Sequence, residues 1–471
     1  MHRPPLAGGT AGPAALRPLL DIVLDALHQG AKTRGGPLPP GGPEAVAQRV
    51  HAAAPTLLPA HGTGAEEALT TLVRALAEGS ADPAEPHCAA HLHTPPLALA
   101  TAADLAAGAL NPSLDSWDQA PAAATLEAHL TQTIAHEIWP HGGGALRTTG
   151  DALVTTGGTE SNQLALLLAR EHHGPVQIVC GAHTHHSIHR AAWLLGLPEP
   201  VVVPAPTGTT DLTALAVALA EPRPHPTLVV ATAGTTDTGA IDPLPAIADL
   251  CTTHHAELHI DAAYGGPLLF SDRHRPQLAG LERAHTITLD LHKLGWQPVA
   301  AGLLAVADPT RLTPLGHRAD YLNADDDTDA GLPDLLGRSL RTTRRPDALK
   351  IAVTLRALGR DGLAHLIDTV CDHATALAQL IDEQPQLELY EHPTISTVLF
   401  RPHGADDHTV AHIRRTLLTD GTAVLGRARA DGRLWLKATL LNPHLTPHDL
   451  HTLLDTTLHA TTAPPTEGTP R

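Results

Sequence analysis

The chain has 471 residues, of which 42% are hydrophobic and only 2% aromatic, so it can form two compact units with cores of Ala, Leu, Val and Ile. Its net charge of −18, from 49 acidic against 31 basic residues, argues against nucleic acid or an anionic membrane as a partner, since both need clustered positive charge. The four cysteines form no CxxC pair and no uncharged apolar run could span a bilayer, so we expect a soluble, cytoplasmic protein without a disulfide framework.

The first 80 residues read as a helical segment. A helix is expected over about 17–29, and the Pro- and Gly-rich stretch 35–44 predicts a linker to the next helix. Residues 1–16 and 461–471 are rich in Pro, Gly and Thr and are expected to form tails.

From about residue 140 apolar strands alternate with helices. We expect strands in VQIVC, PVVVPA, TLVVATA, ELHIDAA and TITLDL, and helices in QLALLLAREHH, TALAVALAE and PAIADLC. This alternation predicts a mainly parallel sheet covered on both faces, in a large domain over 81–340. After about 345, the helix DALKIAVTLRALG and the strands STVLF and LWLKATLL predict a smaller α+β domain over 341–460. The predicted fold class is therefore α/β.

Polar residues follow several of these strands, at the edge where ligands bind in such sheets. Gly157, Gly158 and Thr159 precede a helix and offer backbone N–H groups and a hydroxyl, which suits a phosphate. A Gly-Gly-Thr turn is more often a simple helix cap, and no Walker motif follows it. Thr235 and Thr236 lie in a second polar turn that could contact a phosphate or a ring.

An acid and a lysine follow two further strands. Asp261 comes directly after ELHI, where a buried carboxylate is costly unless a cation or hydrogen-bond donor meets it. Lys293, one of four lysines, follows TITLDLH; on that stretch alone a solvated lysine would be the plainer interpretation. A carboxylate, a lysine and a phosphate cradle at three strand ends together indicate one ligand, pyridoxal 5′-phosphate (PLP).

Five ordered segments resemble the group II PLP-dependent decarboxylases, over about residues 88–445. The segments are TTGGTESN, AHTHHSIHRAAWLLG, ATAGTTDTGAIDP, HIDAAYGG and DLHKLGWQP. The resemblance implies the fold-type I architecture of aspartate aminotransferases. It also implies an obligate homodimer in which segment 1–80 clasps the partner subunit.

The resemblance further implies roles for individual residues. Lys293 would hold the cofactor as a Schiff base, with His292 beside it, and Asp261 would keep the pyridine nitrogen protonated. His185 would stack on the ring face. The other cofactor contacts would come from Gly158, Thr159, Thr235, Thr236, Ala263 and Asp290. Asp290 stands where the aromatic branch has Asn, and a carboxylate near a phosphate is electrostatically unfavourable.

Tyr321 corresponds to a tyrosine that the family carries on a loop crossing to the partner subunit's active site. There the tyrosine protonates Cα after carbon dioxide leaves, whereas relatives with Phe tend towards oxidative deamination to aldehydes. Tyr321 therefore favours decarboxylation, with an ordinary surface tyrosine as the alternative.

The histidine-rich segment HTHHSIH offers a competing metal-site hypothesis. His185 and His189 are four residues apart, a spacing that can bind zinc on a helix. No HExxH motif is present, and 34 histidines make chance clustering common, so we predict no metal site.

The segment LNPSLDSWDQAPAAATLE resembles one that lines the substrate side-chain pocket in the family. It places Asp115 where aromatic decarboxylases have an aromatic residue, followed by Trp117 and Asp118. A buried acid selects a cationic side chain, because an apolar one would leave it unpaired.

Four segments resemble most closely the branch that decarboxylates 2,4-diaminobutyrate: DSWDQ, HKLGWQP, AHLHTPP and LKATLLNP. Ala438 departs from that pattern, which predicts a larger aromatic residue. We therefore expect decarboxylation of a diamino acid, L-2,4-diaminobutyrate, to 1,3-diaminopropane. The alternatives are aromatic-L-amino-acid, lysine or ornithine decarboxylation, oxidative deamination, or a catalytically silent binding homologue.

Overall fold

The computed structural model describes residues 3–140, 150–316, 322 and 324–462, which fall into two compact units. The larger unit comprises Pro96–Cys371 and Pro393–Ile395 and contains a seven-stranded sheet. The smaller unit contains a five-stranded sheet and joins Met1–Pro95, Asp372–His392 and Ser396–Arg471. The domain boundaries expected at residues 80, 340 and 460 remain predictions.

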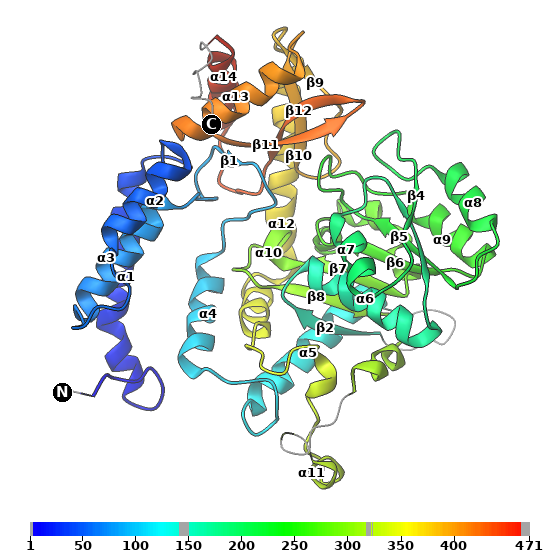
Figure 1. Cartoon of the computed structure of the whole chain (residues 1–471), viewed down its shortest axis with the longest axis horizontal. Coiled ribbons are helices and arrows are strands. Elements are labelled where there is room, and N and C mark those ends of the chain that lie inside the picture. The colour runs from blue at the N-terminus through cyan, green and yellow to red at the C-terminus, as the bar shows by residue number, and fades with distance from the viewer. Residues whose placement is uncertain (1–2, 141–149, 317–321, 323, 463–471) are drawn as a thin grey trace. The chain divides into compact units, whose positions relative to one another are not determined.

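The sheet of the larger unit is mainly parallel, as the sequence predicts (Figure 1). Its order is β2-β8-β7-β6-β5-β3-β4; β8 runs antiparallel to both β2 and β7, and the other neighbouring strands are parallel to each other. The strands are β2 (Asp151–Thr155), β3 (Gln177–Gly181), β4 (Val201–Val203), β5 (Thr227–Thr232), β6 (Glu257–Ala262), β7 (Thr286–Asp290) and β8 (Gly302–Val306). Nearly every residue of β5, β6 and β7 is buried, because helices cover both faces.

Helices alternate with these strands and supply the other half of the core. They are α4 (Ala98–Leu110), α5 (Pro121–Ile138), α6 (Gly158–His173), α7 (His186–Leu194), α8 (Leu212–Ala220), α9 (Leu244–Thr253), α10 (Leu291–Leu294) and α11 (Asp325–Asp329). On one face, Leu166 of α6 and Ile188 of α7 pack with Ile178 of β3 in one buried cluster. A long helix, α12 (Ala348–Asp382), begins in this unit and ends in the smaller one.

The register of the parallel strands aligns their polar carboxyl ends. Asp261 of β6 lies beside Thr232 of β5 on one side and Thr288 of β7 on the other. Asp290, the last residue of β7, lies opposite Gly302 of β8. The residues that follow these strands therefore meet at one edge of the sheet.

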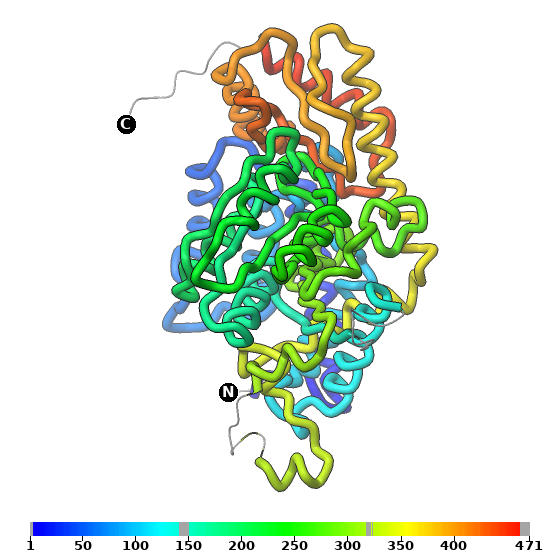
Figure 2. Tube along the Cα trace, turned by 90° about the vertical axis from the view of Figure 1, so that its right-hand side faces the viewer, coloured from blue at the N-terminus to red at the C-terminus, as the bar shows by residue number. Residues whose placement is uncertain are grey.

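The smaller unit combines the two ends of the chain. Its strands are β1 (Cys88–Ala89), β9 (Leu387–Leu389), β10 (Thr397–Pro402), β11 (Val424–Ala430) and β12 (Arg433–Thr439), and its helices are α1 (Gly12–Arg34), α2 (Gly42–Ala53), α3 (Ala65–Gly79), α13 (Asp407–Asp420) and α14 (Pro447–Thr462). β1 pairs in parallel with β11, and α2 lies beside α13 (Figures 1 and 2). The predicted N-terminal helix is confirmed and is longer than the expected span 17–29.

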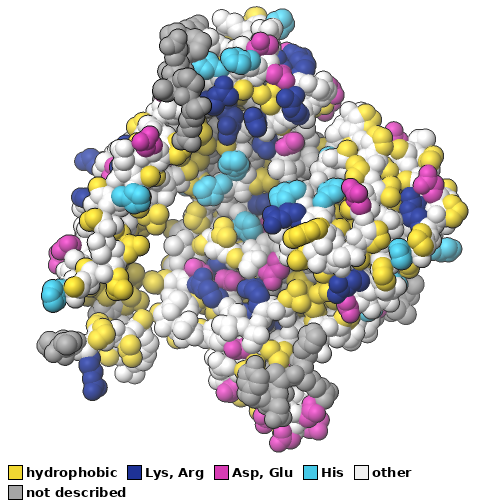
Figure 3. Space-filling model, in the orientation of Figure 1, with side chains coloured by type: hydrophobic (Ala, Val, Ile, Leu, Met, Phe, Trp, Pro, Cys, Tyr) yellow, Lys and Arg dark blue, Asp and Glu magenta, His cyan; other side chains and the backbone are white. Residues whose placement is uncertain are grey.

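No helix in the described part of the chain is both long and apolar enough to cross a membrane. The acidic surplus is visible at α11, whose Asp325, Asp326 and Asp327 are exposed and gather at the lower end of the view in Figure 3. Such a patch repels polyanions.

Candidate active site

The turn between β2 and α6 presents backbone amides at the edge of the sheet. No described side chain caps α6, so its first N–H groups can bind an anion, which the positive end of the helix dipole favours. A Cβ atom at Gly158 would lie 3.0 Å from the Cβ of Ala263 and 3.1 Å from Asp290 Oδ2, so glycine permits this close approach. Thr159, the next residue, is exposed.

Asp261 is a buried carboxylate with two hydrogen-bond donors. The residue is only 5% exposed. Oδ1 accepts a hydrogen bond from the Ala263 N–H at 3.1 Å, and Oδ2 accepts one from Asn162 Nδ2 at 2.7 Å. These bonds hold the carboxylate in place and leave lone pairs for a further donor, such as a protonated ring nitrogen.

Asn162, on α6, hydrogen-bonds to Asp261 and His259 of β6 and to Thr288 of β7. Its Oδ1 lies 2.8 Å from Thr288 Oγ1 and 3.0 Å from His259 Nε2. The other ring nitrogen of His259 lies 2.9 Å from Thr286 Oγ1. Burial lowers the pKa of His259 to about 4, although the charge of Asp261 opposes that shift, so the ring is neutral at neutral pH.

His185 is linked to the same network through Ser187. His185 Nδ1 lies 2.8 Å from Ser187 Oγ, which accepts a hydrogen bond from Asn162 Nδ2 at 2.8 Å. Burial lowers the pKa of His185; the charge of Asp261 raises it and that of Lys293 lowers it. His185, Asp261 and Lys293 therefore share one electrostatic environment.

The zinc hypothesis for the histidine-rich segment required both histidines on one helix. His185 instead precedes α7 as its N-cap, and His189 is exposed. Among the residues that the structure describes, no cluster of His, Cys, Asp or Glu has a metal-binding arrangement.

Lys293 lies in α10, directly after β7. Its Nζ is 3.1 Å from Asp290 Oδ2, and His292 Nε2 is 3.5 Å from the same oxygen. Burial lowers the pKa of His292, partly offset by Asp290. Asp290 Oδ1 is buried without a hydrogen-bond donor among the described residues, and a Cβ at Gly157 would lie 3.7 Å from it. Asp290 thus lies between the lysine and the glycine turn.

The environments of the four lysines differ. Lys32 is exposed, and Lys437 belongs to β12 of the smaller unit. Lys350 is only 1% exposed and forms an ion pair with Asp104 at 3.3 Å. Lys293 is therefore the lysine that lies at the polar edge of the large sheet.

The turn after β5 places its two threonines differently. Thr235 is buried, with its Oγ1 2.8 Å from Thr238 Oγ1, whereas Thr236 is exposed. Asp242 accepts a hydrogen bond at 2.8 Å from the N–H of Thr232, the last residue of β5, and so holds the strand end from which this turn starts. Thr236 is accordingly the more open of the two to a ligand.

The acidic segment between α4 and α5 contains one buried and one exposed acid. Asp115 is 9% exposed, and Trp117 is half-buried. Asp118 is exposed and accepts a hydrogen bond from Ser116 Oγ at 2.5 Å. Asp118 therefore stabilises its own turn, whereas Asp115 is buried. Tyr321 lies outside the described residues.

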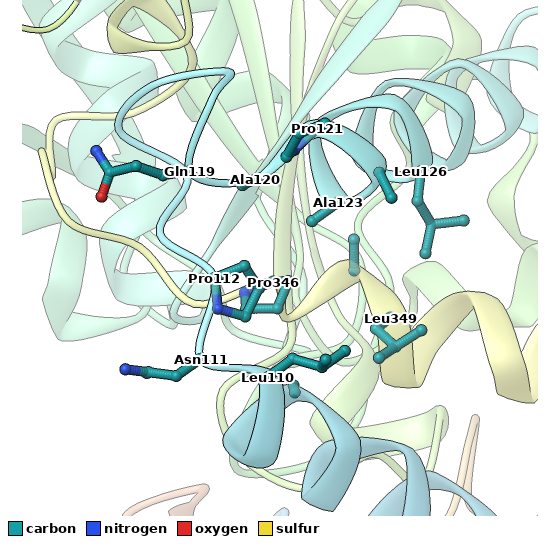
Figure 4. Close-up of a pocket in the computed structure, with 13 residues that line it drawn as sticks. Leu110, Asn111, Pro112, Gln119, Ala120, Pro121, Ala123, Leu126, Pro346 and Leu349 are labelled. Carbon is teal, nitrogen blue, oxygen red and sulfur yellow. The ribbon is translucent and has the colours of Figure 1, made fainter. Parts of the chain in front are cut away.

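An apolar cavity of about 390 Å³ lies next to this segment (Figure 4). Leu110, Pro112, Leu126 and Leu349 contribute to its wall, and no acid, base or nucleophile lines it. Its chemistry does not match the polar edge of the sheet, so this cavity is not the candidate active site.

Comparisons with known proteins decide the family. The family model for the pyridoxal-dependent decarboxylase conserved domain matches residues 48–403. The chain belongs to this family. The enzyme is therefore a PLP-dependent amino-acid decarboxylase, and the resemblance inferred from five sequence segments is confirmed.

Two bacterial relatives share much of the chain. The L-2,4-diaminobutyrate decarboxylase of Rhizobium meliloti (strain 1021) is 42% identical over 415 residues, 84% of this chain and 82% of that protein. The enzyme of the same name from Acinetobacter baumannii is 31% identical over 430 residues, 83% of each chain.

Solved structures confirm the fold-type I architecture of the decarboxylase. One is the glutamate decarboxylase domain of diaminobutyrate-pyruvate transaminase and L-2,4-diaminobutyrate decarboxylase from Vibrio parahaemolyticus. It matches with a TM-score of 0.85 and 32% identity, over 97% of each chain. Oryza sativa TDC with PLP and tryptamine gives a TM-score of 0.86, over 97% of this chain and 99% of that one; at 22% identity it supports the fold alone.

The polar edge of the sheet fits PLP. The uncapped start of α6 suits the phosphate, Asp261 can accept a hydrogen bond from a protonated ring nitrogen, and Lys293 can attach to an aldehyde. The buried, unsatisfied Oδ1 of Asp290 beside the glycine turn also indicates a polar group that completes the site.

No role is predicted from the sequence for Asn162, Ser187, His259 or Thr288. Three of them lie in the segments that resemble the family: Asn162 ends TTGGTESN, His259 begins HIDAAYGG, and Ser187 lies in AHTHHSIHRAAWLLG. Polar residues at buried positions of a helix and a strand are the signal that could have identified them.

We expect Lys293→Ala to abolish turnover and covalent cofactor attachment, because the substitution removes the lysine amine that lies at this edge among the described residues. Borohydride reduction followed by peptide mass mapping should label Lys293 in the wild type and leave the variant unlabelled. A label on Lys32, Lys350 or Lys437 in the wild type would contradict the assignment.

Burial of His259 predicts acid sensitivity of the fold. Because its pKa is lowered from 6.5 to about 4, its contribution to stability is present above about pH 6.5 and is lost as the pH falls towards 4. The loss amounts to about 3 kcal/mol. His259→Gln keeps a donor and an acceptor without titrating. The melting temperature of the wild-type apoprotein should therefore fall more steeply than that of the variant between pH 6.5 and 4.5, and parallel curves would refute this role.

Proposed function

We propose that the enzyme decarboxylates L-2,4-diaminobutyrate to 1,3-diaminopropane and carbon dioxide. Support comes from two relatives of that name, 42% and 31% identical over most of both chains. In the structure, the observation that carries the proposal is the buried carboxylate of Asp115, in the segment between α4 and α5. A buried carboxylate suits a cationic substrate side chain.

PLP, when bound, supplies the electron sink that accepts the electron pair released as the carboxylate leaves. In this proposal Lys293 would hold the cofactor and Asp261 would accept a hydrogen bond from its ring nitrogen. His185 would lie against the ring, and His292 lies beside the lysine. Phosphate contacts would come from Gly158, Thr159, Thr235 and Thr236, and Ala263 and Asp290 would complete the cofactor contacts.

Asp115 selects the substrate by its charge. An ion pair at about 4 Å is worth roughly 1 kcal/mol in water and about 4 kcal/mol at the effective dielectric near a protein surface. At about 1.4 kcal/mol per tenfold, the second value allows discrimination by two to three powers of ten. Trp117, half-buried two residues later, supplies an apolar wall in this proposal.

Tyr321 protonates Cα from the partner subunit of a homodimer in this proposal. The homodimer is supported by apolar side chains that α1 and α3 leave exposed: Leu24 at 62%, Leu27 at 44% and Leu76 at 68%. Exposed apolar side chains on one helical segment are typical of a surface covered in an assembly.

Asp115→Asn tests the substrate assignment. The change removes the charge with little change in volume, so kcat/KM for diaminobutyrate should fall by up to about 100-fold, mainly through KM. Activity on norvaline, which lacks the second amine, should change little. Asp118→Asn should have a smaller effect, because Asp118 is exposed and engaged by Ser116.

Measuring carbon dioxide release from a panel of amino acids tests the choice of substrate separately from PLP-dependent decarboxylation. Release should be fastest with a diamino acid. A wild-type preference for tyrosine, tryptophan or glutamate would refute the substrate while leaving PLP-dependent decarboxylation intact.

The position of Tyr321 can be tested by mixing inactive subunits. If the tyrosine acts across a dimer, Tyr321→Phe and Lys293→Ala subunits should together regain about a quarter of wild-type activity. Random exchange makes half the dimers mixed, and each mixed dimer has one complete site of two. No recovery after verified subunit exchange would place both residues of a site in one chain.

A further inference from the structure

Five buried polar side chains form a hydrogen-bonded chain behind the candidate cofactor site. All belong to residues that are at most 3% exposed, and they come from α6, α7, β6 and β7. They are Asn162, Ser187, His259, Thr286 and Thr288. The chain ends at Asp261 on one branch and at His185 on the other.

The directions of these hydrogen bonds follow from the Asn162 amide. An amide nitrogen only donates hydrogen bonds, so Asn162 Nδ2 donates to Asp261 Oδ2, 2.7 Å away. Asn162 Oδ1 is then an acceptor for Thr288 Oγ1 and for His259 Nε2. His259, which is neutral, therefore carries its proton on Nε2, and its Nδ1 accepts a hydrogen bond from Thr286 Oγ1.

The second branch fixes the protonation of His185. The other amide hydrogen of Asn162 points to Ser187 Oγ at 2.8 Å, so the Ser187 hydroxyl is free to donate. It donates to His185 Nδ1 at 2.8 Å, and the Ser187 N–H approaches the same nitrogen at 3.3 Å. With Nδ1 an acceptor, neutral His185 carries its proton on Nε2.

We propose that Asn162 is a positioning residue that couples the carboxylate of Asp261 to the tautomer of His185. One amide group donates to both branches, while His259 and Thr288 hold its oxygen and prevent the amide from rotating. This inference rests on the proposed roles of Asp261 and His185. It assigns to Asn162 the task of setting both groups before the substrate arrives.

Asn162→Asp is the sharpest test, because it replaces the donor by an acceptor of nearly equal size. Two carboxylates about 3 Å apart cannot both ionise, so the pair retains one proton. The bound cofactor should then show a pH-dependent change in visible absorbance that the wild type lacks. kcat should fall by about 100-fold, with KM changed by less than about threefold.

The retained proton also affects the stability of the apoprotein. In the unfolded variant both carboxyl groups ionise above about pH 4, whereas the folded pair keeps a proton. The melting temperature of Asn162→Asp should therefore fall relative to the wild type as the pH rises from 5 to 8. This measurement needs neither cofactor nor turnover.

Two further variants separate positioning from a purely structural role. Ser187→Ala cuts only the His185 branch; it should lower kcat and shift the pH profile of kcat without creating the new absorbance transition. Ser161→Ala is the matched control. It removes a buried hydrogen bond, to Thr155 Oγ1 at 2.7 Å, from the same turn of α6 but touches neither branch. It should change thermal stability and leave absorbance and pH profiles as in the wild type.

The proposal would be overturned if the absorbance and pH profiles of Asn162→Asp and Ser187→Ala both match those of Ser161→Ala. If Asn162→Asp does not fold, the comparison of Ser187→Ala with Ser161→Ala decides. Asp261→Asn distinguishes a failure of the proposed function of Asp261 from a failure of the role of Asn162. Near-normal turnover in Asp261→Asn would refute the proposed function of Asp261, whereas severe loss there with a normal Asn162→Asp would refute only the role of Asn162.

Discussion

The arrangement at the edge of the large sheet depends on satisfying one buried carboxylate. Asp261 is 5% exposed, and an uncompensated charge there would cost several kcal/mol. The Ala263 N–H and the Asn162 amide meet that need. Asn162 lies on α6 and also contacts residues of β6 and β7. The hydrogen bond that it donates to Asp261 therefore connects the helix that would bind the phosphate with the strands next to the ring and to Lys293.

Charge is distributed in pairs along this edge. Asp290 lies between the glycine turn and Lys293, 3.1 Å from the lysine nitrogen, and the half-buried rings of His185 and His292 both have lowered pKa values. Neutral imidazoles add hydrogen-bonding capacity without adding charge, so the negative charges of two aspartates and the positive charge of one lysine dominate the field. The cationic ring nitrogen of the cofactor complements Asp261, whereas its anionic phosphate is favoured by the uncapped start of α6.

The sequence predicted the strands that carry the site, because VQIVC, TLVVATA, ELHIDAA and TITLDL are apolar runs bounded by polar turns. The structure confirms these strands and their parallel pairing, whereas their order within the sheet was not predicted. The sequence did not anticipate the antiparallel strand β8, since an apolar run such as GLLAV does not encode its direction. Nor did it indicate the pairing of β1 with β11, which joins residues more than 300 positions apart. Asn162 was overlooked for a similar reason: its partner Asp261 is 99 residues away, and nothing local marks the contact. The roles of Asp115 and Tyr321 remain predictions.

A crystal structure of the PLP-loaded enzyme tests the central claim most directly. The account predicts continuous density from the cofactor to Lys293 Nζ, the phosphate at the start of α6, and the ring nitrogen within hydrogen-bond distance of Asp261 Oδ1 or Oδ2. A cofactor joined to another lysine, or a ring nitrogen that faces away from Asp261, would contradict it.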